Sequence, residues 1–339
     1  MNQGLQPGTL LRDRYEILSL IGQGGMGSVY KASDRRLPGR LCAIKEILPP
    51  PGPGASALTH AQEQFLREAS TLARLDHPNL PKVSDYFALA PHEANGQAAT
   101  SRDYLVMDYV PGQDLHQAVQ GARREQRFLD QREVLGWMAQ LCDALIYLHE
   151  QEPPVLHRDV KPGNIKLTPE GRIKLVDFGL VKPLDPDDPK TLTGMRGIGS
   201  LPYTPIEQYA GELGHTDTRS DLYSLGATLY HLLTGGPPAS AQDRFLDPDA
   251  LVLPSQTNPA ITPAVERAIL VALALHPNER PESVSSWSKM LLGDAPTIPV
   301  AVHPTETGWG EALRENWWLL LAALAVIAAA LFLTFYQSL

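Results

Sequence analysis

The chain has 339 residues, of which 43% are hydrophobic and 20% are charged, a composition that is typical of globular proteins and excludes a wholly disordered chain. It carries 38 acidic and 29 basic residues, and the resulting net charge of −9 argues against a dedicated nucleic-acid binder. The two cysteines, Cys42 and Cys142, supply neither a disulfide framework nor a zinc site, so a reducing compartment is expected.

The predicted elements change type along the chain. Segments 15–18, 28–31, 41–45 and 104–107 favour strands, and one helical pattern lies between them at residues 65–75. Segments 49–56 and 88–101 are predicted to be surface loops. After residue 112 helical patterns dominate, with apolar stripes over 134–148 and 222–233. A strand-rich part followed by a helix-rich part indicates an α+β fold with two lobes.

The C-terminal part differs from the rest. Residues 293–316 contain three prolines and three glycines without a helical or strand period over most of their length, and are predicted to be a linker. Residues 317–336 are uncharged, and a helix of that length spans ~30 Å, the thickness of a hydrocarbon core. The alternative, a buried core helix, would show a polar stripe that this segment lacks. We therefore expect a transmembrane helix, with Trp317 and Tyr336 near its two ends.

A glycine-rich segment begins at Ile21 and contains Gly22, Gly24 and Gly27 in the spacing G-x-G-x-x-G. Dinucleotide-binding folds use the same spacing, but there a helix follows the last glycine. Here the strand-like residues 28–31 follow, so the glycines are expected at a hairpin tip where backbone amides approach a polyphosphate. On this motif alone, an ordinary glycine-rich turn stays an alternative.

The strand at residues 41–45 and the helix after it supply a candidate ion pair. Ala43 and Lys45 are two residues apart, so they share one face of a strand. A small alanine leaves room for a flat base, and the lysine can reach phosphate oxygens. Glu68 on the following helix is the preferred partner of Lys45, and Glu63 on the same helix is the alternative.

The segment His157-Arg-Asp-Val-Lys-Pro-Gly-Asn164 is more specific. It places a candidate base, Asp159, a cation, Lys161, and an amide ligand, Asn164, within six residues. Asp177 follows at the end of the strand predicted at 173–176. Phosphoryl transfer needs a carboxylate for the attacking hydroxyl, oxygen ligands for Mg²⁺ and a cation near the transferred group.

Over roughly residues 12–292 the chain resembles eukaryotic-like (Hanks-type) serine/threonine protein kinases of the bacterial membrane-associated kind, because the motifs occur in that family's order. The resemblance implies an N-lobe at 12–108 with one regulatory helix, a helical C-lobe at 111–292, and ATP with Mg²⁺, or Mn²⁺ in its place. It implies catalytic roles for Asp159, Lys161, Lys45 and Glu68, and metal ligation by Asn164 and Asp177. The nucleotide site that it implies comprises Ile21, Gly22, Gln23, Gly24, Gly25, Met26, Gly27, Ser28, Val29, Ala43, Lys45, Met107, Asp108 and Val110.

The resemblance also implies supporting residues, and it has departures. Asp221 matches the buried aspartate that steadies the catalytic loop, and Arg280 matches the partner of the glutamate at the end of the activation segment. That segment, usually ending Ala-Pro-Glu, reads Pro205-Ile-Glu207 here, and a serine, Ser200, replaces the usual threonine before it. The glutamate is retained, so a pair between Glu207 and Arg280 is expected.

Three functions are possible for a chain with these motifs. A nucleotide-binding pseudokinase would commonly lack Lys45, Asp159 or Asp177, and all three are present. An aminoglycoside-type small-molecule kinase would lack the activation segment. The sequence therefore favours an active enzyme that phosphorylates Ser and Thr hydroxyls of proteins, in signal transduction.

The sequence also supports predictions of regulation and location. Arg158 and Lys182 form a candidate cationic pocket for an activation-loop phosphate, and Thr191 and Thr193 are the expected acceptors. We expect a single-pass, tail-anchored protein of the cell membrane with its kinase domain in the cytoplasm. Its expected partners are protein substrates, the membrane and, transiently, a second copy of the chain, but not nucleic acid.

Overall fold

The structure, a computed structural model, describes residues 4–24, 27–47, 69–89, 102–177, 198–209 and 216–293. The chain divides into two compact units, Met1–Asp294 and Ala295–Leu339. The predicted linker from residue 294 onward and the predicted transmembrane helix at 317–336 lie outside the described residues. Within the described ranges, no helix is both long enough and apolar enough to span a bilayer.

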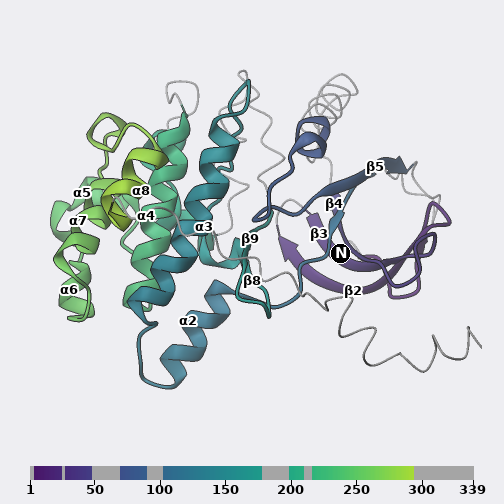
Figure 1. The fold of residues 1–339 in the computed structure, drawn as a ribbon, viewed down its shortest axis with the longest axis horizontal. Helices are drawn as coiled ribbons and strands as arrows, with labels where there is room; N and C mark the ends of the chain where they lie inside the picture. Colours follow the sequence, from purple (N-terminus) through teal and green to yellow (C-terminus); the bar gives the residue numbers. More distant parts are fainter. Residues whose placement is uncertain are drawn as a thin grey trace, which may run out of the picture. The chain divides into compact units, whose positions relative to one another are not determined.

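The N-lobe is built on one antiparallel sheet of six strands (Figure 1). Its strand order is β1-β2-β3-β4-β6-β5, and each neighbouring pair is antiparallel. The predicted strands of this region are all found, and each is longer than its sequence pattern suggested. The strands are β1 (Leu10–Leu11), β2 (Tyr15–Gly24), β3 (Gly27–Asp34), β4 (Leu41–Ile47), β5 (Val83–Leu89) and β6 (Arg102–Asp108).

Two strands of this sheet were missed by the sequence patterns. β5 pairs with β6 at the edge of the sheet, and it includes Ala88 and Leu89, which were predicted to begin a loop. Its sequence, VSDYFAL, carries polar residues at its second and third positions and does not alternate cleanly, because only Val83 and Phe87 are buried. β1 lies before the predicted start of the domain at residue 12 and pairs with β2. Residues 69–74 form the described end of the helix predicted at 65–75.

Strand β4 is the centre of the N-lobe. Six of its seven residues are buried, and its two faces pack against different cores. Cys42 and Ile44 belong to a cluster confined to the sheet, with Ile17, Tyr30 and Val106. The opposite face, with Ala43, belongs to the large cluster that continues into the C-lobe. The sheet therefore fixes which side chains face the space between the lobes.

The C-lobe is mainly helical, as the sequence predicted. A small antiparallel sheet lies beside its first helices, in the order β7-β8-β9. Its strands are β7 (Gln113–Asp114), β8 (Ile165–Leu167) and β9 (Ile173–Leu175). The α-helices are α2 (Leu115–Arg124), α3 (Gln131–His149), α4 (Thr218–Thr234), α5 (Ala241–Leu246), α6 (Pro254–Thr257), α7 (Pro263–Ala272) and α8 (Val284–Leu292).

The helices begin and end at residues that satisfy their terminal backbone groups. Asp114 forms a capping box with Gln117 at the start of α2, and Asp130 accepts from two backbone amides at the start of α3. Helix α4 begins at the N-cap Asp217 and ends at Gly235, whose φ of 79° is easily adopted only by glycine. Short 3₁₀ helices η1 (Pro162–Asn164), η3 (Ile198–Tyr203), η4 (Ile206–Gln208), η6 (Pro248–Ala250) and η7 (Pro277–Glu279) connect the longer elements.

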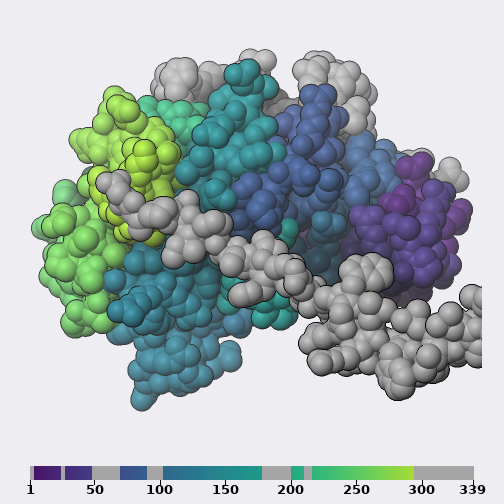
Figure 2. All heavy atoms as spheres, viewed as in Figure 1, coloured from purple at the N-terminus to yellow at the C-terminus, as the bar shows by residue number. Residues whose placement is uncertain are grey.

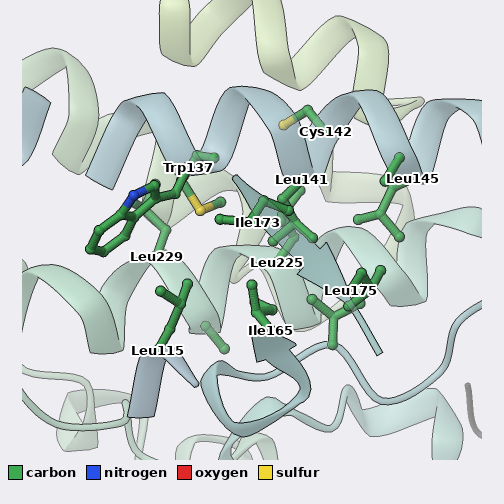
Figure 3. Close-up of a cluster of buried hydrophobic side chains, with 14 of the residues drawn as sticks. Leu115, Trp137, Leu141, Cys142, Leu145, Ile165, Ile173, Leu175, Leu225 and Leu229 are labelled. Carbon is green, nitrogen blue, oxygen red and sulfur yellow. The ribbon is translucent and has the colours of Figure 1, made fainter. Parts of the chain in front are cut away.

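The C-lobe core lies between α3, α4 and the small sheet. Leu141 and Leu145 of α3 point toward Ile173 and Leu175 of β9 and toward Leu225 of α4 (Figure 3). Side chains fill the space between the C-lobe helices on the face shown in Figure 2. Helix α4 is buried along nearly its whole length, and polar residues such as Ser220, Asp221 and Ser224 are buried on it together with its leucines. The catalytic-loop segment 157–164 is thus attached to a rigid helical core.

Candidate active site

The glycine-rich segment forms a hairpin, as predicted. Gly24 at the end of β2 pairs with Gly27 at the start of β3, and no helix follows Gly27. Gly27 has a φ of 139°, and a Cβ there would lie 1.9 Å from the carbonyl oxygen of Glu46 on β4. Only glycine therefore allows β3 to approach β4 this closely. Gly25 and Met26, at the hairpin tip, lie outside the described residues.

Several residues that the resemblance assigns to the nucleotide share one face of the N-lobe sheet. Val29 of β3 lies opposite Lys45 of β4, and Ala43 lies opposite Met107 of β6. Ala43, Lys45 and Met107 are each less than 10% exposed. Asp108 ends β6, and its backbone N–H donates to the carbonyl oxygen of Lys82, 3.0 Å away. The sheet register thus aligns the candidate adenine and phosphate contacts along one surface.

Lys45 reaches across to the C-lobe. Its Nζ forms an ion pair with Oδ1 of Asp177, which lies two residues after the end of β9. Burial by itself raises the pKa of Asp177, but the charge of Lys45 and its hydrogen bond outweigh this and hold that pKa below its usual value. Asp177 is therefore a carboxylate at neutral pH. Glu68 and Glu63 both lie outside the described residues, so the choice between them stays a prediction.

Three predicted residues meet at the catalytic loop. Lys161 Nζ donates to Asp159 Oδ2 at 2.8 Å and to Ser200 Oγ at 2.7 Å. Asn164 Nδ2 donates to the same Oδ2 at 2.8 Å and to the backbone oxygen of Asp159 at 2.9 Å. The carboxylate of Asp159 is one-third exposed and fixed by two donors, which suits a group that must receive a proton from a bound hydroxyl.

The backbone of this loop is unusual. Arg158 and Asp177 both have a φ of 64°, the left-handed region that non-glycine residues seldom adopt. Such residues cost about 1–3 kcal/mol each and persist where surrounding contacts over-determine them. At Arg158 the contact is visible, because its backbone N–H donates to Oδ1 of Asp221 at 2.7 Å. One strained residue therefore directly precedes the candidate base Asp159, and the other is the candidate metal ligand Asp177.

Asp221 is the anchor that the resemblance predicted. It is fully buried on α4, and its Oδ2 accepts from the backbone N–H of His157 at 2.8 Å and lies 2.9 Å from His149 Nε2. Burial raises the pKa of Asp221, but the hydrogen bond from His149 and the neighbouring groups outweigh it, so its pKa lies below the usual value. Asp221 therefore remains charged and holds the catalytic loop onto α4. The contact with His149, at the end of α3, had no sequence signal of its own.

The expected pair between Glu207 and Arg280 is present and bidentate, with N–O distances of 2.7 and 3.0 Å. The remaining guanidinium donors bond three backbone carbonyls, those of Ala274, Arg219 and Leu275. The guanidinium also lies 5.0 Å from the ring centroid of Tyr223. The altered Pro205-Ile206 sequence therefore does not disturb this contact, since Ile206 packs against the core.

The donor set fits a divalent metal. Asn164 offers an amide oxygen, because its amide nitrogen is committed to Asp159, and Asp177 offers a carboxylate. Hard oxygen ligands of this kind suit Mg²⁺, which binds few protein groups and keeps phosphate and water ligands. No cluster of three or more His, Cys, Asp or Glu side chains that would suit a metal occurs among the described residues. The two predicted ligands therefore suit a metal that arrives with a nucleotide.

Some predicted residues are not described and one contact was not foreseen. The activation-loop threonines Thr191 and Thr193, and Lys182, lie outside the described residues. Arg158 is described, but its predicted cationic pocket is incomplete without Lys182. Ser200 was noted only for retaining a hydroxyl, whereas the structure places its Oγ on Lys161. The two residues are 39 positions apart, so no local pattern reveals their contact.

The two-lobed fold and this group of side chains are those of a protein kinase. A family model described as the protein kinase domain matches residues 15–284, so the chain belongs to the protein kinase family.

Several bacterial proteins are similar to this chain. The chain is 37% identical to a probable serine/threonine-protein kinase PknB of Bifidobacterium longum, with 68% of this chain and 32% of that protein covered. It is 32% identical to PknB of Mycolicibacterium smegmatis over 87% of this chain and 46% of that protein. It is 35% identical to PknA of Mycobacterium tuberculosis over 80% of this chain and 59% of that protein. The chain thus spans between a third and three-fifths of the length of these relatives.

Solved structures show the same fold. The apo form of PpkA-294 superimposes with a TM-score of 0.65 at 27% identity, covering 85% of this chain and 99% of that one. The kinase domain of Mycobacterium tuberculosis PknI superimposes with a TM-score of 0.60 at 28% identity, covering 85% of this chain and 98% of that one.

Proposed function

We propose that this chain transfers the γ-phosphoryl group of ATP to serine and threonine hydroxyls of proteins. The observation that carries the proposal is the position of Lys161, whose Nζ joins Asp159 Oδ2 at 2.8 Å to Ser200 Oγ at 2.7 Å. A lysine two residues after the base is the serine/threonine pattern of the family that the chain resembles. The relatives named above carry that same designation.

The chain's own residues account for the chemistry. Asp159 orients the substrate hydroxyl and accepts its proton as the hydroxyl oxygen bonds to the γ-phosphorus. The bond from that phosphorus to the bridging oxygen breaks, and ADP leaves with the electron pair. Lys161 lies 2.8 Å from Asp159, so its charge is available to offset charge on the transferred group. Asn164 keeps the carboxylate of Asp159 in one orientation.

The nucleotide site uses both lobes. The face of the sheet with Ala43 and Met107 is buried and apolar, which suits a purine, and Lys45 on the same face suits a phosphate. Asn164 and Asp177 would hold Mg²⁺, which neutralises phosphate charge when it is bound.

The test is phosphoryl transfer by the purified full chain with labelled ATP, Mg²⁺ and myelin basic protein. Asp159→Asn keeps the size of the side chain but removes the base, so transfer should fall by about 10³-fold or more. Nucleotide binding, measured separately, should persist in this variant. Equal transfer by both proteins would refute the role of Asp159. A wild type that binds ATP but transfers nothing would instead support the pseudokinase alternative.

The location is also our proposal. The uncharged segment 317–336 has the length of a membrane helix, and Arg314 on its near side agrees weakly with a cytoplasmic kinase domain. The linker at 293–316 would be a flexible tether between the kinase domain and the membrane, with an r.m.s. end-to-end distance of ~27 Å. Confinement at the membrane raises the encounter rate between copies and favours phosphorylation in trans.

Deletion of residues 317–339 tests this anchor. The truncated protein should leave the membrane fraction, and a truncated protein that stays there would refute the anchor. If it becomes soluble at native abundance and its activation-loop phosphorylation is unchanged, the proximity argument fails while the anchor stands.

Activation is proposed to occur at Thr191 or Thr193. Mass spectrometry of autophosphorylated protein should find a phosphate on one of them, where Arg158 and Lys182 can bind it. Full activity of the double variant Thr191→Ala/Thr193→Ala would place the switch elsewhere.

A further inference from the structure

Three ring side chains from three different elements meet in the C-lobe near the catalytic loop. They are Tyr203 of η3, His231 of α4 and His116 of α2. The hydroxyl of Tyr203 lies 2.5 Å from His231 Nδ1, and the two rings stack with centroids 6.1 Å apart. His116 meets the ring of His231 edge-on at 5.7 Å. Neither the sequence patterns nor the proposed mechanism uses any of these residues.

The chemistry of the group fixes the direction of its hydrogen bond. His231 is 4% exposed, and burial, with smaller contributions from His116 and Arg123, lowers its pKa to about 4. Burial also raises the pKa of Tyr203, which therefore keeps its proton. At neutral pH the imidazole is neutral, so Nδ1 accepts the proton of the Tyr203 hydroxyl and Nε2 carries the ring proton.

This bond holds the segment that contacts the catalytic lysine. Tyr203 lies three residues after Ser200, whose Oγ accepts from Lys161 at 2.7 Å. The segment is attached to α4 at two further points, where Ser224 Oγ donates to the backbone oxygen of Tyr203 at 2.7 Å and Ser220 Oγ donates to Glu207 at 2.8 Å. Ser220, Ser224 and His231 are spaced i, i+4 and i+11, so they lie along one face of the helix.

The hydrogen bond between Tyr203 and His231 lies on the protein-substrate side of the site, away from the nucleotide contacts. The nucleotide contacts lie on the N-lobe sheet and at Asp177, whereas Tyr203 and His231 lie in the C-lobe next to Ser200. A loosened segment would displace Ser200 and, through it, Lys161 and Asp159. The residues that would hold the purine would not move.

We propose that His231, acting through Tyr203, is a positioning residue for the protein substrate. It holds segment 198–209 so that Ser200, Lys161 and Asp159 present one geometry to the incoming hydroxyl. This inference rests on the proposed kinase activity, and it concerns the protein-binding half of the site only.

The test uses the purified full chain with myelin basic protein. His231→Phe removes the acceptor, and Tyr203→Phe removes the donor. Each should lower kcat/KM for the protein substrate about tenfold, the effect of one buried hydrogen bond, and leave the KM for ATP unchanged. The double variant should lose no more than either single one, because the two residues act as one unit. In His231→Asn, the side-chain Oδ1 can accept the Tyr203 proton in place of Nδ1. This variant should therefore keep most of the wild-type kcat/KM that His231→Phe loses.

Tyr230→Phe is the matched control. Tyr230 neighbours His231 on α4, is 5% exposed, and donates its hydroxyl proton to the carbonyl of Val252 at 3.0 Å. Its substitution removes a buried tyrosine hydroxyl of the same kind without touching segment 198–209. It should leave kcat/KM for the protein substrate unchanged. Thermal unfolding shows whether each variant is folded, and Tyr203→Phe and His231→Asn decide the question if His231→Phe does not fold.

The outcomes separate this inference from the proposed function. An active wild type with unchanged kcat/KM in folded Tyr203→Phe overturns the positioning role alone. An equal loss in Tyr230→Phe also overturns it, because the effect would then be general to the helix. A rise in the KM for ATP that matches the loss would place the effect in the nucleotide site and overturn it too. A wild type that phosphorylates no protein overturns the proposed function itself.

Discussion

The two lobes present their catalytic groups in different ways. The N-lobe presents Lys45 from the middle of β4, a strand with neighbours on both sides. The C-lobe presents Asp159 from a loop, next to a residue with a φ of 64°. A strand orients a side chain through its register, so the whole sheet shares the task. A loop has no register, so individual buried contacts must hold it.

The contacts in the N-lobe agree with this difference. Lys45 faces Val29 and Leu105 on the neighbouring strands, and Glu46 points to the other face. Glu46 is buried there and accepts from Tyr30 at 2.9 Å and Arg102 at 2.5 Å. These bonds tie three strands together but touch no catalytic group. If one of these hydrogen bonds were lost, the other contacts between the strands would still hold the sheet together.

In the C-lobe the support is concentrated on two residues. Asp221 binds two backbone amides of the catalytic loop and one histidine. Arg280 binds the carboxylate of Glu207 at the end of the activation segment and three backbone carbonyls of α4 and of the segment after α7. We therefore expect single substitutions to do most damage in the C-lobe.

The largest effect is expected for Asp221→Ala. It leaves the backbone N–H groups of His157 and Arg158 and the imidazole of His149 without their partner, so the free energy of unfolding should fall by about 3 kcal/mol. Urea unfolding measures this, and kinase activity should fall with it. Asp217→Ala on the same helix removes the N-cap bond to the backbone of Arg219 and a partly exposed ion pair with the Arg219 side chain, and should cost only about 1 kcal/mol. Equal losses of unfolding free energy in the two variants would contradict the special role of Asp221 in holding the catalytic loop.

Acid should weaken the C-lobe through His231. Its pKa is about 4 in the folded protein and about 6.5 when unfolded. The unfolded state therefore binds the proton first, and stability that is complete above pH 6.5 is lost as the pH falls toward 4. The loss reaches roughly 3 kcal/mol. Urea unfolding at pH 7 and pH 4.5 should show a flatter pH dependence for His231→Asn, and parallel curves would refute the assignment.

A smaller loss is expected for Arg280→Lys. Lysine keeps the charge but has three donors where the guanidinium uses all five, and it cannot form the bidentate pair with Glu207. The cost should be about 2 kcal/mol in urea unfolding. Arg244→Lys is the control, because Arg244 forms no bidentate pair in the described part of the chain, and lysine can retain its 2.7 Å bond to the carbonyl of Leu273. If the two variants lose the same stability, the several hydrogen bonds of Arg280 are not what stabilises the C-lobe.

The smallest effect is expected in the N-lobe, for Gly27→Ala. The new Cβ would meet the carbonyl oxygen of Glu46 at 1.9 Å, so the hairpin must move. Because the sheet shares the change, the cost should be about 1–2 kcal/mol, with a raised KM for ATP. Gly22→Ala is the steric control, since its Cβ would lie 3.7 Å from Val29. A loss as large as that of Asp221→Ala would break the comparison between the lobes.

Much of the fold was predictable because its signals are local. The strand at 41–45, the hairpin at the glycines and the helices at 134–148 and 222–233 all appear where the patterns placed them. β5 was missed because it is an edge strand with two buried apolar residues, and half-buried edges carry a weak alternation. The short strands β7 and β8 were missed because two or three residues cannot show a period.

The sequence by itself determined which chemical groups the site contains. Asp159, Lys161 and Asn164 lie within six residues, and a spacing that short limits how far apart their side chains can be. It also determined that Ala43 and Lys45 share a face, because a strand alternates with a period of two.

Only the tertiary structure decided how these groups are held. Lys45 meets Asp177 across 132 residues, Lys161 meets Ser200 across 39, and Tyr203 meets His231 across 28. Such contacts leave no periodic trace, because each depends on how separate elements pack rather than on the spacing along one of them. The left-handed backbone at Arg158 is of the same kind, since it is stable only while the buried carboxylate of Asp221, 63 residues away, accepts its N–H.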